Sequence, residues 1–271
     1  MTSAYVFTLE GLLLKAIVCE ETNKKIFMTK RWVIPDIHGC ALTLKYLMES
    51  MVKPNKNDEI YFVGDYIDRG PDSKGVIDYI MAMQENDYNI ICLMGNHEDY
   101  CIRAWEEDMH KKGFLGIRSK GKTLKEWERY GGKQTMESFD VERPKEIPEK
   151  YIKWMKDLKY YVELDDFIIV HAGLNFRNED PFEDKRAMIW ARDFAIKPEK
   201  IDNKKIIHGH VPVNHEFIDL AVNSKDYKFI DIDNGVYIQS RAGYGNLVAL
   251  ELNEMKVVTH SLMDEVDYKG V

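Results

Sequence analysis

Five short polar motifs follow five apolar runs in order along the chain, and no other feature limits the fold as strongly. The motifs are DIHG at 36–39, GDYIDRG at 64–70, GNHE at 95–98, HAG at 171–173 and GHVP at 209–212. About two dozen residues separate DIHG from GDYIDRG, and GDYIDRG from GNHE, which is the length of one strand and one helix each time. Because parallel strands place their carboxyl ends at one edge of a sheet, we expect the motifs to meet there.

The segments around the motifs alternate between strand and helix patterns. Apolar runs predict strands at 31–34, 59–65 and 88–96, and amphipathic patterns predict helices at 41–52 and 75–86. Further strands are predicted at 160–164, 167–173, 204–209 and 227–233, with a hairpin at 246–262. Strands separated by helices indicate a buried parallel sheet in the first half, and we predict a more antiparallel second half. The predicted fold class is α/β, a four-layer α-β-β-α sandwich of two mixed sheets.

Charged, helix-prone residues occupy the chain from about 97 to 158, which predicts a helical lid inserted over the strand ends. We predict one domain over 28–271 that contains this insertion. Residues 1–27 are predicted to be an N-terminal extension of uncertain status, since Met28 is an alternative start. The basic stretch at 110–125 is either a solvated loop or a surface that meets a phosphorylated partner.

The composition is that of a globular protein, with 45% of the 271 residues hydrophobic and 31% charged. A formal net charge of −8 disfavours a broad nucleic-acid surface. The four cysteines form no CxxC pair, and no apolar stretch reads as a membrane span or a signal peptide. We therefore expect a cytoplasmic protein without a membrane or nucleic-acid partner, and its oligomeric state is open.

The motif side chains form a donor set for two metal ions. Asp36 and His38 lie two positions apart at a strand end, so both side chains point the same way and reach one ion. Asp65 has two oxygens and bridges that ion to a second one. The second site is completed by the amide oxygen and imidazoles of Asn96, His171 and His210. This set of oxygen and nitrogen donors without a thiolate favours two divalent ions, with Mn, Fe and Zn as candidates.

Each motif also has an ordinary structural explanation when it is taken alone. An Asp-x-His sequence often lies in a surface loop or at the start of a helix, GNHE resembles a helix cap, and HAG carries little information. Only their occurrence in one order, each after an apolar run, points to a shared site.

The motif series resembles that of the calcineurin-like metallophosphoesterases. The forms DRG and GNHE resemble more narrowly the phosphoprotein phosphatase branch, in its bacterial and bacteriophage forms. That branch includes serine/threonine phosphatases, the bacteriophage lambda phosphatase and symmetrical diadenosine tetraphosphatases. MIWARD at 188–193 is similar to a later segment of the branch, and YGGKQT at 130–135 is similar to part of its lid. The resemblance runs from about residue 31 to the end.

The resemblance implies roles for individual residues. The first metal ion would be held by Asp36, His38 and Asp65, and the second by Asp65, Asn96, His171 and His210. His97 is similar to the family's general acid, and Asp68 to the carboxylate that orients it. The substrate phosphate would be contacted by Arg69, Arg192 and Asn96.

The predicted function is therefore a dinuclear metal-dependent phosphomonoesterase that acts on protein phosphoserine or phosphothreonine. The implied step is direct attack by a metal-bridging hydroxide, with His97 as the general acid. The alternative is symmetrical hydrolysis of dinucleoside polyphosphates such as diadenosine tetraphosphate, so the partner is a phosphorylated protein or a small phosphoester. A non-catalytic phosphatase-like binding module is least favoured, because every ligand position and the acid–base pair are filled.

Two prolines depart from the family pattern. Pro35 stands where relatives usually have glycine, which leaves its effect on metal affinity open. Pro212 stands where some relatives have a second ligating histidine. Of the three histidines near this motif, His210 is the predicted ligand, His208 a neighbour of the site and His215 a bystander.

Overall fold

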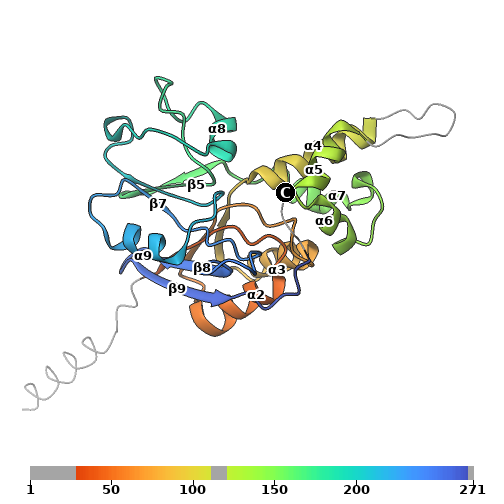
Figure 1. The fold of residues 1–271 in the computed structure, drawn as a ribbon, viewed down its shortest axis with the longest axis horizontal. Helices are drawn as coiled ribbons and strands as arrows, with labels where there is room; N and C mark the ends of the chain where they lie inside the picture. The colour runs from red at the N-terminus through yellow and green to blue at the C-terminus, as the bar shows by residue number, and fades with distance from the viewer. Residues whose placement is uncertain (1–28, 111–120, 268–271) are drawn as a thin grey trace, which may run out of the picture.

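The computed structural model describes residues 29–110 and 121–267, and the structural statements below concern these residues (Figure 1). The predicted extension at 1–27 lies outside the described residues, as does most of the basic stretch at 110–125. Among the described helices, none is long and apolar enough to cross a membrane.

The first sheet carries the strands that precede the first three motifs. Its strands are β1 (Arg31–Ile34), β2 (Glu59–Phe62), β3 (Asn89–Cys92), β8 (Asn246–Glu251) and β9 (Lys256–Ser261), in the spatial order β3-β2-β1-β8-β9. β1, β2 and β3 are parallel, because helices connect them as crossovers. The crossovers are α2 (Ala41–Tyr46) with the π-helical turn η1 (Leu47–Val52), and α3 (Ser73–Glu85). β8 and β9 form the predicted antiparallel hairpin, which joins this sheet beside β1.

The second sheet carries the strands that precede the last two motifs. It consists of β4 (Tyr161–Glu163), β5 (Phe167–Val170), β6 (Lys205–His208) and β7 (Phe229–Asp231), in that order. β4 is antiparallel to β5, but β5, β6 and β7 are parallel. The predicted antiparallel character is therefore wrong for these three strands. Their crossovers contain only short helices, α8 (Lys185–Trp190) and α9 (His215–Asn223), together with the 3₁₀ turn η3 (Pro198–Lys200) and long loops.

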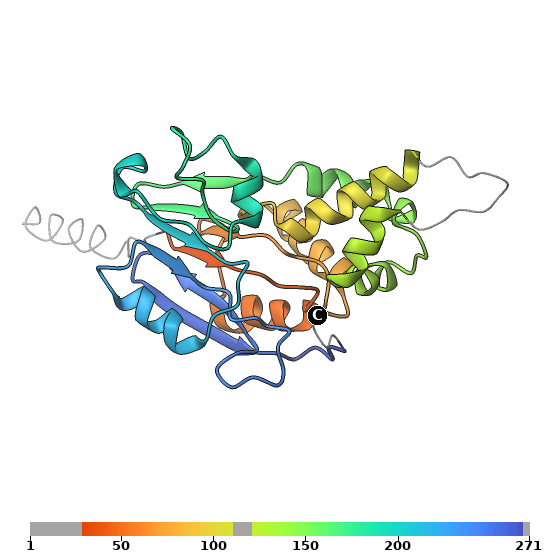
Figure 2. The ribbon, with the colours of Figure 1, turned by 45° about the horizontal axis from the view of Figure 1, so that its top comes forward.

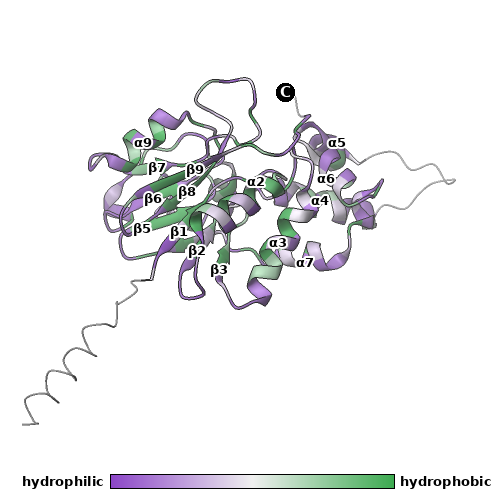
Figure 3. Ribbon diagram, turned by 90° about the horizontal axis from the view of Figure 1, so that it is seen from below, coloured by the Kyte–Doolittle hydropathy of each residue, from purple (hydrophilic) through white to green (hydrophobic). Residues whose placement is uncertain are grey.

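The two sheets pack face to face and helices cover their outer faces, as Figure 2 shows. Val33, Tyr61 and Val248 point from the first sheet into a shared core with Ile169 and Ile207 of the second. The alternate residues of the same strands belong to a second buried cluster that includes α2, α3 and α8. Both sheet faces are thus buried, and the strands are the most hydrophobic part of the ribbon in Figure 3. The predicted four-layer sandwich is confirmed, with α8 as a thin outer layer over the second sheet.

The chain between β3 and β4 is helical, as its composition predicts. This helical segment, residues 96–158, contains α4 (Asn96–His110), α5 (Lys122–Arg129), α6 (Gly132–Ser138), the 3₁₀ turn η2 (Pro144–Glu146) and α7 (Glu149–Lys156). It lies to one side of the sheets in Figures 1 and 2. Its buried Trp127 and Tyr151 belong to the same core as α2 and α3. The segment is therefore packed onto the rest of the domain rather than attached by a hinge alone.

Candidate metal centre

The structure brings the predicted ligands together at the carboxyl ends of the strands. They follow five strands in the two sheets, namely β1, β2, β3, β5 and β6. All are largely buried, and His210 with 9% exposure is the most accessible of Asp36, His38, Asp65, Asn96, His171 and His210. Strands that are distant in sequence thus place the polar residues that follow them at one point between the sheets.

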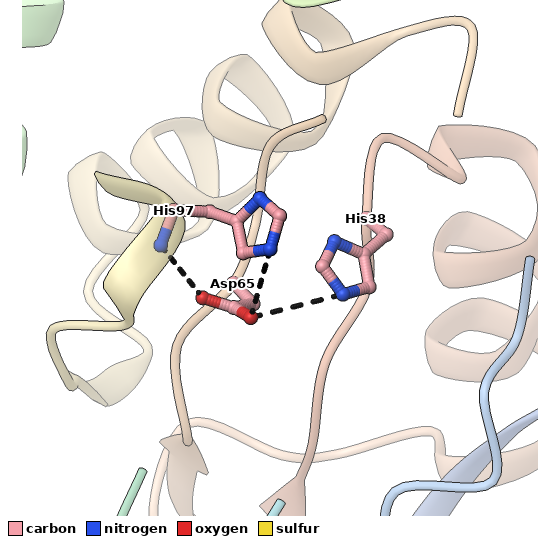
Figure 4. A group of neighbouring side chains, drawn as sticks. All are labelled: His38, Asp65 and His97. Carbon is pink, nitrogen blue, oxygen red and sulfur yellow. Dashed lines mark hydrogen bonds and ion pairs between the residues drawn. The ribbon is translucent and has the colours of Figure 1, made fainter. Parts of the chain in front are cut away.

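The first group of donors surrounds one oxygen of Asp65. Asp65 Oδ2 lies 3.7 Å from His38 Nε2 and 3.7 Å from His97 Nε2 (Figure 4). Asp36 Oδ2 lies 3.8 Å from the same His38 nitrogen. The donor atoms of His38, Asp65 and His97 all lie within 4.8 Å of one another, which is close enough to surround one ion.

The second group surrounds the other oxygen of Asp65. Asp65 Oδ1 lies 3.5 Å from His171 Nε2, and Asp65, His171 and His210 offer donor atoms within 4.8 Å of one another. Asn96 Oδ1 completes the group, at 3.1 Å from His171 Nε2 and 2.9 Å from His210 Nδ1. One carboxylate therefore faces both groups, as the bridging position predicted from the sequence requires.

The protonation of the imidazoles shows that these donors fit a cation. His38 Nδ1 lies 3.0 Å from the Ile67 carbonyl oxygen, and His171 Nδ1 lies 3.1 Å from that of Val63. A carbonyl oxygen only accepts, so each Nδ1 carries the proton and each Nε2 presents a lone pair. The His171 lone pair then faces oxygens of Asn96 and Asp65, and a positive ion is the natural partner of three such electron-pair donors. Backbone carbonyls that fix the imidazole tautomer in this way are typical of metal-binding histidines.

Burial shifts the pKa values of these imidazoles and carboxylates in directions that also favour a bound cation. Burial lowers the pKa of His38 and His171 well below the usual range and that of His210 to about 3, so these rings are neutral donors. Burial, together with neighbouring carboxylates, raises the pKa of Asp36 and Asp65 well above the usual range. A nearby divalent cation reverses that penalty by stabilising the charged carboxylates.

His97, the third member of the first group, also forms a hydrogen-bonded pair with Asp68. His97 Nδ1 lies 2.6 Å from Asp68 Oδ2, which directs His97 Nε2 toward the centre. Arg69 lies between the two imidazoles, with Nη2 at 3.1 Å from His97 Nε2 and Nη1 at 2.7 Å from His38 Nε2. The Asp68–His97 pair and the position of Arg69 agree with the geometry that their predicted roles need.

Two donors from the helical segment hold Asp68 in place, and sequence reasoning missed both. The Trp127 indole N–H donates to Asp68 Oδ2 at 2.8 Å, and the Thr135 hydroxyl donates to Asp68 Oδ1 at 2.5 Å. The Thr135 hydroxyl oxygen also accepts from the Asp68 backbone N–H at 2.9 Å. Gly131 makes this approach possible, because a Cβ there would lie 2.5 Å from the Arg69 backbone nitrogen. The helical segment is thus part of the site.

Glu98 and Tyr237 are two further residues that sequence reasoning left without a role. The buried Glu98 carboxylate accepts backbone N–H groups of Asp65 at 2.9 Å, Tyr66 at 2.8 Å and Gly95 at 3.1 Å, which fixes the loop that carries the bridging carboxylate. The Tyr237 ring lies 4.3 Å from the Arg69 guanidinium. The fixed form of GNHE was the available signal for Glu98.

The loops of the centre adopt unusual backbone conformations. His38, Asp65, Asp68, Arg69 and His210 all have positive φ, between 48° and 76°. Residues other than glycine adopt this region at an energetic cost, and such conformations concentrate at functional sites. The surrounding hydrogen bonds therefore hold these side chains in positions that the backbone alone would not favour.

The remaining sequence predictions concern the edge of the centre. Arg192 is exposed, and its charge is near enough to His210 to help lower the pKa of that ring. Pro35 directly follows the last residue of β1 and leaves Asp36 oriented into the centre, where both carboxylate oxygens accept the His210 backbone N–H at 3.1 Å. His208 is buried at the end of β6 and belongs to neither donor group.

A family model for calcineurin-like phosphoesterases matches residues 29–238 of the chain, which include every motif described above. The chain belongs to this family. The family predicted from the motifs is confirmed, and the protein is a metallophosphoesterase whose donor groups lie where the five motifs place them.

Curated relatives of this phosphoesterase are tetraphosphatases. A symmetrical bis(5'-nucleosyl)-tetraphosphatase of Pseudomonas fluorescens is 25% identical over 145 residues, which are 53% of this chain and 42% of the relative. The chain thus matches less than half of that relative's length. An asymmetrical bis(5'-nucleosyl)-tetraphosphatase of Anoxybacillus flavithermus is 27% identical over 257 residues, covering 84% of this chain and 92% of the relative.

Solved structures share the fold of this phosphoesterase. A putative diadenosine tetraphosphatase superposes with a TM-score of 0.58 and 15% identity, covering 87% of this chain and 94% of the other. A serine/threonine phosphatase from Saccharomyces cerevisiae superposes with a TM-score of 0.56 and 16% identity, covering 96% and 92%. At these identities the likeness concerns the fold, which both kinds of hydrolase share.

Proposed function

We propose that this metallophosphoesterase hydrolyses phosphoric esters or anhydrides at a centre of two divalent metal ions. The observation that carries the proposal is the position of Asp65, whose two oxygens face two separate groups of donors. The first ion would be held by Asp36, His38 and Asp65, and the second by Asp65, Asn96, His171 and His210. When bound, such a pair of ions polarises the phosphoryl oxygen and lowers the pKa of an attacking water.

The remaining side chains have roles that follow from their positions. In its doubly protonated form, His97 protonates the leaving oxygen through Nε2, because Asp68 accepts from Nδ1 and keeps Nε2 directed at the centre. Arg69 reaches the same space and donates to the phosphoryl oxygens, and Tyr237 supports its guanidinium from the side. Arg192 supplies further positive charge from the solvent side, and the Asn96 amide completes the contact with the phosphate.

For the substrate we propose a dinucleoside polyphosphate, which the sequence motifs alone ranked second. The curated relatives described above carry tetraphosphatase names, and one of them aligns along most of both chains. Phosphoserine or phosphothreonine in a protein is the second candidate, favoured by the DRG and GNHE forms of the motifs. A non-catalytic module is disfavoured because the donor set and the Asp68–His97 pair are complete.

A parallel assay separates these substrates. Diadenosine tetraphosphate, a phosphoserine peptide and p-nitrophenyl phosphate are each incubated with the protein and Mn²⁺, with and without a chelator. We expect metal-dependent hydrolysis of all three substrates. The kcat/KM for diadenosine tetraphosphate is expected to exceed that for each of the other two by about tenfold or more. ADP as the only nucleotide product indicates symmetrical cleavage, whereas AMP with ATP indicates asymmetrical cleavage. Faster hydrolysis of the phosphopeptide reverses the substrate assignment, and inactivity on all three refutes the proposed function.

Replacing Trp127 with Phe is expected to lower kcat roughly tenfold and to leave KM and metal content nearly unchanged. The change removes the indole N–H that Asp68 Oδ2 accepts, and a hydrogen bond to a charged group contributes about 1.5–3 kcal/mol. Trp105→Phe is the matched control, because the Trp105 N–H donates to the Ile147 carbonyl in the same helical segment. Steady-state kinetics and thermal melting of both variants check the prediction, and equal kcat values would contradict it.

A further inference from the structure

A cavity of about 410 Å³ lies between the helical segment and α8. Three aromatic side chains contribute to its wall, and they are Tyr100, Tyr160 and Trp190. Three cationic side chains surround the same space, and they are Arg103, Lys185 and Arg186. Its volume is in the range of sites that hold small organic ligands.

A row of aromatic rings joins this cavity to the metal centre. The His97 ring contacts the edge of Tyr130 at 6.3 Å between centroids, and Tyr130 stacks on Tyr100 at 5.3 Å. Tyr100 meets Trp190 edge to face at 5.2 Å, and Trp190 meets His210 at 6.3 Å. The cavity wall therefore continues directly into the general acid on one side and into a metal ligand on the other.

The charges of the cavity suit an anion that also carries polar hydrogen-bonding groups. Arg103 pairs with Asp99 at 3.0 Å, and its guanidinium lies 4.8 Å above the Tyr100 ring. Lys185 Nζ lies 4.8 Å above the Tyr160 ring, and Arg186 is exposed beside it. Glu126 is the second carboxylate of the lining, so three cations face two anions. Aromatic faces with an excess of cations are the chemistry that binds a nucleobase and a phosphate together.

We propose that this cavity holds the nucleoside phosphate end of the leaving group, an inference that rests on the proposed function. The leaving oxygen lies on the His97 side of the reacting phosphorus, because His97 is the acid that protonates it. The row of Tyr130 and Tyr100 leads from that position into the cavity. The base packs against Tyr160 and Trp190, Lys185 and Arg186 contact the phosphates beyond the reacting one, and the carboxylates accept from amino or hydroxyl groups.

The test compares selectivity between substrates that differ in size. In a Lys185→Ala/Arg186→Ala double variant, kcat/KM for diadenosine tetraphosphate is expected to fall at least about tenfold relative to kcat/KM for p-nitrophenyl phosphate, mainly through a higher KM. Lys150→Ala/Lys153→Ala is the matched control, because it removes two exposed cations from α7 and changes the net charge equally. The control is expected to leave the ratio within about twofold of wild type.

A second variant addresses the nucleobase. Tyr160→Leu is expected to lower kcat/KM for diadenosine tetraphosphate several-fold and to leave inorganic tripolyphosphate, which has no base, nearly unaffected. If wild type shows no metal-dependent hydrolysis of diadenosine tetraphosphate, the phosphoserine peptide or p-nitrophenyl phosphate, the proposed function fails. If that activity is present and neither variant changes its substrate ratio, the metal centre stands and the cavity assignment is overturned. The cavity assignment is also overturned if the variants lower kcat/KM for the phosphopeptide, relative to p-nitrophenyl phosphate, and leave the ratio for diadenosine tetraphosphate unchanged.

Discussion

Replacing His97 with Asn is expected to lower kcat by roughly 10²–10⁴ while leaving the amount of bound metal near that of wild type. The reason is the position of the ring, which Asp68 holds at 2.6 Å through Nδ1 while Nε2 points at the centre. Asparagine keeps a polar group at this place but cannot deliver a proton to the leaving oxygen. Steady-state kinetics and elemental analysis of the purified variant measure the two quantities separately.

The dependence on the leaving group makes this prediction specific for acid catalysis. A leaving group that is stable as an anion needs little protonation, so p-nitrophenyl phosphate is expected to lose less rate than phenyl phosphate in His97→Asn. Asp68→Asn is expected to show the same pattern in weaker form, because the ring would keep its proton donor but lose its orientation. Equal losses for both esters, or unchanged turnover, would rule out His97 as the general acid.

The positions of the proposed ligands could be predicted from the sequence because each one lies within four residues after the end of a strand. The strand ends fix where Asp36, Asp65 and His171 lie, and a short motif fixes the side chain that points into the centre. The local sequence is therefore nearly sufficient to predict where these side chains lie. The parallel order of β5, β6 and β7 was harder to predict, since long loops with short helices replace the regular crossovers of the first sheet.

The supporting residues could not be predicted in the same way. Trp127 and Thr135 reach Asp68 across 59 and 67 positions of sequence, through the packing of α5 and α6 on the loop after β2. A tryptophan in an amphipathic helix normally indicates a core position, and Trp127 is indeed fully buried. Only the tertiary structure shows that the one polar side-chain atom of Trp127 donates to Asp68, the carboxylate beside the proposed general acid His97.

These contacts change the interpretation of the helical segment. A lid that only covers the strand ends would contact substrate and leave the acid–base pair unaffected. Here the segment supplies the Asp68 donors and also the Tyr130 and Tyr100 rings between His97 and the cavity. We infer that changes in this segment alter both the rate of protonation and the choice of leaving group without altering the donor groups.

Replacing Asp65 with Asn is expected to abolish tight binding at both metal positions and to lower kcat/KM by roughly 10³ or more. Within the described part of the chain, Asp65 is the side chain shared by both donor groups, with Oδ2 at 3.7 Å from His38 and Oδ1 at 3.5 Å from His171. The neutral amide removes the charge that offsets two divalent ions. Calorimetric titration with Mn²⁺ is expected to show two sites in wild type and no tight site in the variant.

Thermal melting gives a second readout that does not depend on activity. A ligand that binds only the folded protein raises the melting temperature, so Mn²⁺ is expected to stabilise wild type and to have little effect on Asp65→Asn. Without added metal the variant is expected to melt at or above the wild-type temperature, because burial raises the pKa of Asp65 and makes its charge unfavourable there. Asp36→Asn is the control, since Asp36 approaches a donor nitrogen of the first group, His38 Nε2, and meets the second group only through the His210 backbone N–H, so it should leave one tight site. Two tight sites in Asp65→Asn would mean that this carboxylate does not bridge the ions.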